Sequence, residues 1–287
     1  MQGYVKAVAK VTLDILCIVL AFLPFLVLYL ARVEPAERGF FCDDESIAFP
    51  YRDSTVSEGL LFGLGFGITV ASVVLGEVLV SCSYRVLPPH RGSSPLPGGI
   101  VNALYVRLAA FLMGAAASQS LTEIAKVSIG RLRPHFLTVC RPDPVLTNCS
   151  SELISLDMCS GERELILEAR KSFYSGHASF AMYTMAFLAL YLHSRLRAAS
   201  LRLLRALLQL SVVLLALWVG YSRVSDYKHH WSDVLAGLVQ GAVVAAVAVI
   251  HLADLPWGDD EEEPPKNPHE DLTSVQSVHQ YTNTYKM

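Results

Sequence analysis

The stretch from Val8 to Ala31 reads VAKVTLDILCIVLAFLPFLVLYLA, and it decides the class of fold. A cleaved signal peptide has an apolar region of about 7–15 residues, and the run from Val11 to Ala31 is longer than that. A transmembrane helix needs about 20 mostly apolar residues. The stretch therefore predicts a retained helix that anchors the chain in a membrane.

Five further segments come close to the same length and hydropathy: Glu58–Cys82, Val101–Val127, His177–His193, Leu203–Tyr221 and Trp231–Ala253. The fourth and fifth of the six spans are the weakest, because arginines crowd the connection between them. We therefore predict an all-α, polytopic membrane protein with six transmembrane helices over residues 1–254. The acidic, proline-bearing segment 255–287 predicts a disordered cytoplasmic tail.

The composition supports a membrane protein and argues against other classes. Of the 287 residues, 53% are hydrophobic and 17% are charged, and the net charge is −3. A soluble domain carries about 25% charged residues. Nucleic acid is not expected as a partner, because no strongly basic region is present. The sequence contains no C-x-x-C pair, so a zinc site is not expected.

The sidedness of the spans follows from their connections. Cytoplasmic loops are enriched in Lys and Arg, which predicts that the connection after the fourth span is cytoplasmic. The sequon Asn148-Cys149-Ser150 falls in the third connection, on the opposite side, where it predicts a glycan. Four cysteines lie in polar connections and would form two disulfides in an oxidising compartment, with the pairing left open. They are Cys42, Cys140, Cys149 and Cys159.

A first polar cluster closes the third span. Lys126 and Arg133 are seven residues apart, nearly two helical turns, so both would face the same way. Pro134 predicts that the helix ends at Arg133. Two cations would then point at one site near the membrane surface. The alternative is that both are ordinary cations reaching from a helix end to the interface.

A second cluster, Ser175-Gly176-His177, opens the fourth span. Amides at a helix start bind anions, and glycine lets a ligand approach the backbone. Ser175 would add a hydroxyl donor. The alternative is an N-cap serine followed by an interfacial histidine.

A third cluster precedes the sixth span and holds Arg223, His229, His230 and Asp233. Asp233 follows His229 by four residues, so a helix would place its carboxylate beside that imidazole. His230 lacks a carboxylate at this spacing, which favours His229 as the nucleophile. The alternative is a polar loop with an aspartate at a helix start.

With six spans, the three clusters lie on the same side of the membrane. Together they offer three cations, amide donors, two histidines and a carboxylate. That combination suits a phosphate dianion and lacks the carboxylate cluster that would bind Mg²⁺.

The spacing resembles that of the type 2 phosphatidic acid phosphatase and vanadium haloperoxidase superfamily. Lys126 precedes Arg133-Pro134 by six intervening residues, and Ser175-Gly176-His177 follows. Ser222-Arg223, five residues, His229, three residues and Asp233 complete the pattern. Three stretches resemble the lipid phosphate phosphatases of animals in particular: RGFFC from Arg38, FLMGAA from Phe111 and VSDYKHHW from Val224. Tyr174 departs from the proline usual in the wider superfamily.

The resemblance implies a metal-independent phosphatase with no cofactor that acts through a phosphohistidine. His229 is expected to be the nucleophile, oriented by Asp233, and His177 the acid and base. The groups expected to bind phosphate are Lys126, Arg133, Ser175, Gly176 and Arg223. The implied substrates are phosphatidate, lysophosphatidate, sphingosine 1-phosphate and ceramide 1-phosphate.

The location expected is the plasma membrane, with the site extracellular or luminal, and endoplasmic reticulum or endosomal membranes are alternatives. Whether the chain forms a homo-oligomer is left open. Three other functions are kept as alternatives. They are a sugar-phosphate phosphatase with the same motifs, a transporter, and a non-catalytic membrane protein that binds lipid or a partner.

Overall fold

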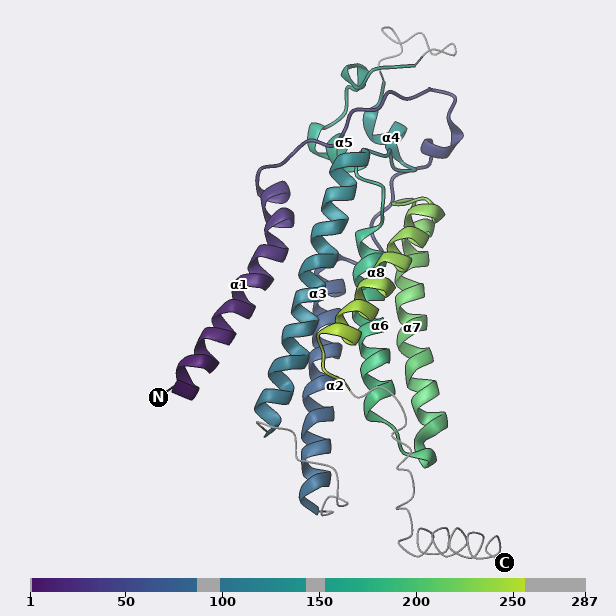
Figure 1. Cartoon of the computed structure of the whole chain (residues 1–287). Coiled ribbons are helices and arrows are strands. Elements are labelled where there is room, and N and C mark those ends of the chain that lie inside the picture. Colours follow the sequence, from purple (N-terminus) through teal and green to yellow (C-terminus); the bar gives the residue numbers. More distant parts are fainter. Residues whose placement is uncertain (1, 87–98, 143–152, 256–287) are drawn as a thin grey trace, which may run out of the picture. The chain divides into compact units, whose positions relative to one another are not determined.

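Helices make up all the long elements of the structure. The computed structural model describes residues 2–86, 99–142 and 153–255 (Figure 1). Within these ranges, two isolated bridges, Phe40 with Ile154 and Pro142 with Cys159, are the only β-type pairings. The all-α prediction is thus confirmed. The six long helices are α1 (Gln2–Leu30), α2 (Glu58–Val86), α3 (Gly99–Ile129), α6 (Gly176–Arg195), α7 (Arg202–Ser225) and α8 (Trp231–His251).

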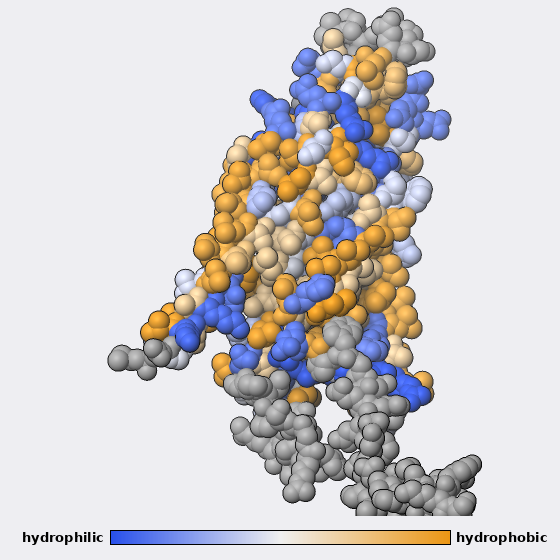
Figure 2. Space-filling model, in the orientation of Figure 1, coloured by the Kyte–Doolittle hydropathy of each residue, from blue (hydrophilic) through white to orange (hydrophobic). Residues whose placement is uncertain are grey.

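Five of these helices, α1, α2, α3, α7 and α8, are long and apolar enough to cross a membrane. Hydrophobic residues cover much of their surface, and hydrophilic residues gather toward the two ends of the helices (Figure 2). Of the two spans predicted to be weakest, α7 qualifies by composition and α6 does not. Helix α6 has 20 residues and packs against α2, α3, α7 and α8. Because it faces protein rather than lipid, it needs less apolar surface. The chain is a multi-pass membrane protein.

Helices α6 and α8 approach each other closely because two glycines of α8 face α6. A Cβ atom on Gly237 would lie 2.6 Å from the carbonyl oxygen of Ser175, and one on Gly241 would lie 2.2 Å from that of Ser179. Any side chain at these positions would push the backbones apart. The contact fixes the start of α6 against the first turns of α8.

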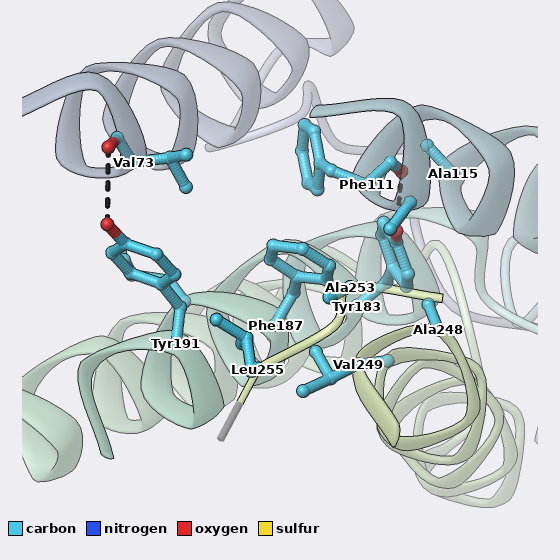
Figure 3. Close-up of a cluster of buried hydrophobic side chains, with 13 residues drawn as sticks. Val73, Phe111, Ala115, Tyr183, Phe187, Tyr191, Ala248, Val249, Ala253 and Leu255 are labelled. Atoms are coloured by element: carbon cyan, nitrogen blue, oxygen red, sulfur yellow. Dashed lines mark hydrogen bonds between the residues drawn. The ribbon is translucent and has the colours of Figure 1, made fainter. Parts of the chain in front are cut away.

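Aromatic residues fill the core between α2, α3, α6 and α8 (Figure 3). The Tyr183 hydroxyl donates to the carbonyl of Phe111 at 2.5 Å, and the Tyr191 hydroxyl donates to that of Val73 at 3.2 Å. Phe187 lies between the two tyrosines. Each buried hydroxyl thus has a partner, which avoids the cost of an unsatisfied polar group.

A buried ion cluster joins α2, α3 and α6 at the end of α6 opposite to Ser175-Gly176-His177. Glu77 lies 2.8 Å from Arg195 and 3.6 Å from Arg107. The Tyr191 hydroxyl also lies 3.1 Å from a carboxylate oxygen of Glu77, so this oxygen and the Val73 carbonyl share its single hydrogen. Glu77 is itself almost completely buried.

The connections after α1 and α3 fold together at one end of the bundle, where they include α4 (Phe136–Cys140) and α5 (Arg163–Ala169). Cys140 is bonded to Cys159, and Cys42 is also disulfide-bonded. One disulfide therefore joins two of the four cysteines of the polar connections, and Cys149 lies outside the described residues. The predicted sequon at Asn148 and the tail from Pro256 onward lie outside the described residues.

Candidate active site

The end of α3 positions the first two cations. Helix α3 ends at Ile129 because Gly130 adopts φ +58°, and a Cβ atom there would lie 2.0 Å from the carbonyl oxygen of Ala36. The predicted helix through Arg133 is therefore wrong by four residues. Lys126 lies in the last turn of α3, whereas Arg133 lies in the irregular segment beyond it.

Both cations already have carboxylate neighbours. The Lys126 ammonium lies 3.4 Å from Glu123, and Arg133 pairs closely with Glu168. The side chain of Glu168 is 55% exposed, whereas Arg133 is almost fully buried. A bound anion would compete with these carboxylates for the two cations.

The start of α6 has the geometry expected both of an anion-binding site and of an ordinary N-cap serine. Ser175 is fully buried and is the N-cap, because its hydroxyl oxygen accepts from the Ala178 amide at 3.4 Å. Its hydroxyl hydrogen is left to donate elsewhere. A Cβ atom on Gly176 would lie 3.5 Å from the Lys126 ammonium, so the second cluster meets the first here.

His177 lies in the first turn of α6, as predicted. Its Nε2 atom donates to the carbonyl oxygen of Val56 at 3.1 Å, in the connection that leads into α2. Lys126, Arg133 and Arg223 lie within electrostatic range of the ring. His177 therefore lies close to the same three cations.

The third cation stands at the end of α7. Arg223 is buried and lies 2.9 Å from the carboxylate of Asp226. The backbone and hydroxyl of Thr55 both donate to Asp226, at 2.8 and 2.7 Å. Thr55, in the connection before α2, thus holds the carboxylate that fixes Arg223.

His229 is buried at the centre of this group. Its Nδ1–H donates to the carbonyl oxygen of Ser172 at 2.7 Å. Burial and the charges of Arg133 and Lys126 hold the pKa of the His229 imidazole well below its usual value. The ring is therefore neutral, and the hydrogen bond at Nδ1 leaves a lone pair on Nε2.

The predicted contact between Asp233 and His229 is wrong. His229 precedes α8, which begins at Trp231 with His230 as its N-cap, so the four-residue helical spacing does not apply. The carboxylate of Asp233 instead accepts from Arg131 at 2.5 Å and from the Ser172 hydroxyl at 2.6 Å.

The spacing argument against His230 also needs correction. Its backbone amide and its Nδ1 atom both lie 3.2 Å from Asp233, so this histidine is the one beside the carboxylate. Nevertheless, His229 is the residue that lies in the field of Arg133, Lys126 and His177. The preference for His229 therefore now rests on the surrounding cations.

Three residues that lie in this region were not predicted from the sequence. Arg131 and Ser172 both contact Asp233, and Lys228 is buried within electrostatic range of Arg133 and Arg223. Its ammonium lies 3.8 Å from the centre of the Tyr51 ring, and burial lowers its pKa to about 8. The adjacency of Lys228 to His229 in the chain was the one available signal.

The site therefore combines a neutral nucleophile with donors for an anion. In the ranges that the structure describes, no three His, Cys, Asp or Glu side chains cluster as metal ligands. The cations Lys126, Arg133 and Arg223 surround two histidines, next to the start of α6. Such a site can hold the oxygens of a phosphoryl group and attack its phosphorus.

Residues 107–256 match the family model described as the PAP2 superfamily. The chain is 50% identical to phospholipid phosphatase 1 of Rattus norvegicus over 85% of both chains. It is 50% identical to phospholipid phosphatase 2 of Homo sapiens, over 85% of this chain and 83% of the relative. Identity to phospholipid phosphatase 1 of Mus musculus is 42% over 96% of each chain. No solved structure matched the chain.

Proposed function

Because the chain belongs to the PAP2 superfamily, we propose that it is a phosphatase that hydrolyses the phosphomonoester of a membrane lipid. One observation carries the mechanism: His229 is neutral and buried, and its Nδ1–H is fixed on the Ser172 carbonyl. Its Nε2 is therefore the nucleophilic nitrogen. The cations around it suit a phosphate dianion.

The reaction has two steps. Nε2 of His229 attacks phosphorus and forms an N–P bond, and the bond from phosphorus to the lipid oxygen breaks. His177, protonated on both nitrogens once the phosphate dianion is bound beside it, gives its Nε2 proton to the departing alkoxide and becomes neutral. A water molecule then attacks the phosphohistidine, His177 takes its proton, and inorganic phosphate leaves with restoration of His229.

The cations and the start of α6 supply electrostatic stabilisation. Lys126, Arg133 and Arg223, with the Ser175 hydroxyl and the Gly176 amide, hold the phosphoryl oxygens as charge develops. His177 must also change its hydrogen-bond partner before it can act as the acid, because its Nε2 donates to the Val56 carbonyl in the resting structure. Donation from this nitrogen requires the substrate oxygen to replace the Val56 carbonyl.

A lipid substrate fits the place of the site at the ends of membrane-spanning helices. The relatives are named as phospholipid phosphatases, which supports a phospholipid as the substrate. Phosphatidate, lysophosphatidate, sphingosine 1-phosphate and ceramide 1-phosphate are the candidates that the sequence resemblance implies. The bonded Cys140 and Cys159 support an oxidising compartment on this side. We therefore place the site on the extracellular or luminal face.

The test compares lipid and water-soluble phosphates. The purified chain in detergent micelles is expected to release phosphate from lysophosphatidate far faster than from glucose 6-phosphate or glycerol phosphate. Faster release from the sugar phosphate would instead support the sugar-phosphate reading. Release from none of them, by a chain shown to be folded, would support the non-catalytic reading.

A further inference from the structure

We infer that Asp233 acts on His229 through Ser172, which makes Ser172 a positioning residue for the nucleophile. The inference rests on the proposed function for its catalytic meaning. It replaces the direct pair of carboxylate and imidazole that the sequence predicted.

Three groups of Ser172 are held at once, and the residue is fully buried. Its backbone amide donates to the Arg131 carbonyl at 3.0 Å. Its hydroxyl donates to Asp233 at 2.6 Å, and its carbonyl accepts the Nδ1–H of His229 at 2.7 Å. The residue whose carbonyl orients His229 is thus held through both its backbone amide and its side chain.

Asp233 is fixed in turn, so it cannot readily move toward His229. One carboxylate oxygen accepts from Arg131 at 2.5 Å, and the other accepts from Ser172 and from the His230 amide. The Arg131 guanidinium also donates to the Ser232 hydroxyl at 2.8 Å. The carboxylate is completely buried, where a displaced charge would be costly.

This chain of contacts explains how a distant carboxylate serves the reaction. A fixed Ser172 carbonyl keeps the proton of His229 on Nδ1 and the lone pair on Nε2. When Nε2 bonds to phosphorus, the ring gains positive charge and its Nδ1–H donates more strongly. The Asp233 charge, one hydrogen bond beyond Ser172, then opposes that positive charge in a low-dielectric surrounding.

A purely structural role for Asp233 is the competing explanation. Asp233 and His230 form a capping box at the start of α8, which by itself stabilises a helix. In that case Ser172 would matter for stability alone. The two explanations differ in their effect on the chemical step, which a kinetic comparison separates.

The experiment compares the native chain with Ser172→Ala, Asp233→Asn and the double variant, using kcat, KM and the rate of phosphohistidine formation. Ser172→Ala is expected to lower kcat and the rate of formation about tenfold, while KM stays within about twofold. In the Ser172→Ala background, Asp233→Asn should then lower kcat by no more than about twofold, because the two residues act in series. Ser120→Ala is the matched control, because it removes a buried hydroxyl that donates to the Ala21 carbonyl outside this network, and it should keep the native kcat.

Two results would overturn the inference. One is an unchanged rate of phosphohistidine formation in Ser172→Ala. The other is a double variant whose loss equals the product of the two single losses, since that indicates independent action.

A nitrogen NMR spectrum of the histidine-labelled chain separates this inference from the proposed function. The His229 resonance, assigned by its loss in His229→Gln, is expected to show protonation at Nδ1 alone. In Ser172→Ala the two neutral tautomers should mix. A native chain with the Nδ1 tautomer but no phosphatase activity would overturn the proposed function alone. Protonation of His229 at Nε2 would overturn the positioning role.

Discussion

His135 and His229 are both buried within electrostatic range of Arg133, but their contacts differ. Nδ1 of His135 donates to the Tyr227 carbonyl at 2.8 Å, and its ring meets the edge of Tyr51. Burial lowers the pKa of His135 to about 4, against the opposing effect of that hydrogen bond. His135 therefore supports the fold of the outer segments in its neutral form.

Acid should destabilise the chain partly through His135. Its folded pKa lies below the unfolded value of about 6.5, so the stabilisation is complete above pH 6.5 and is lost as the pH falls toward 4. At pH 5 the loss is about 2 kcal/mol. We expect the thermal midpoint to fall less between pH 7 and pH 5 in His135→Gln than in the native chain. An equal fall in both would show that His135 does not titrate in this way.

The chemistry-bearing residues were predictable from the sequence, but some of their contacts were not. Polar residues at the ends of apolar spans are conspicuous, so Lys126, His177 and His229 could be identified. The partner of Asp233 depends on the residue at which α8 begins. Because α8 begins at Trp231, Asp233 contacts His230 and not His229. Ser172 could not be found because a serine that joins a carboxylate to a histidine through its hydroxyl and its carbonyl has no distinctive spacing.

Helix α6 shows a similar limit for whole elements. Its sequence is the least membrane-like of the long helices because its neighbours are other helices. Pro134 predicts an end of α3 at Arg133, whereas the left-handed conformation of Gly130 ends the helix earlier. The glycines of α2 and α8 look alike in the sequence. Only the structure shows that Gly237 and Gly241 face a neighbouring backbone.

Substitution at Gly241 should therefore separate α6 from α8. Gly241→Ala is expected to destabilise the chain by about 1–3 kcal/mol, because its Cβ would meet the Ser179 carbonyl. The shift should also lower kcat, since α6 carries His177 and α8 carries Asp233. Thermal unfolding in detergent and phosphate release would measure both effects.

The control is Gly63→Ala in α2, where nothing lies within 4 Å of the added Cβ atom. Alanine is favoured over glycine within a helix, so this variant should be neutral or slightly stabilised. Equal behaviour of the two variants would contradict a tight contact at Gly241.

The molecule as a whole has a definite sidedness in this account. The disulfide between Cys140 and Cys159 and the catalytic groups share one end of the bundle, whereas Arg195 lies at the other end of α6. The positive-inside pattern predicts that this end of α6 is cytoplasmic. The catalytic end should accordingly face the lumen or the cell exterior.

Glycan mapping tests this orientation. In cells, the native chain should lose mass on treatment with a glycosidase that removes N-linked glycans, and Asn148→Gln should not. A second sequon, created in the tail by Asp271→Asn before Leu272 and Thr273, should stay unmodified in the Asn148→Gln background. A glycan on the tail sequon would reverse the assigned orientation.

The most direct test of the central claim is capture of the phosphorylated enzyme. The purified chain is mixed with ³²P-labelled lysophosphatidate in excess EDTA, quenched in alkali and separated by size. The account predicts alkali-stable label on the native chain and on His230→Ala, and none on His229→Ala. Label that persists in His229→Ala, or that disappears in EDTA, would contradict a metal-independent phosphatase with His229 as its nucleophile.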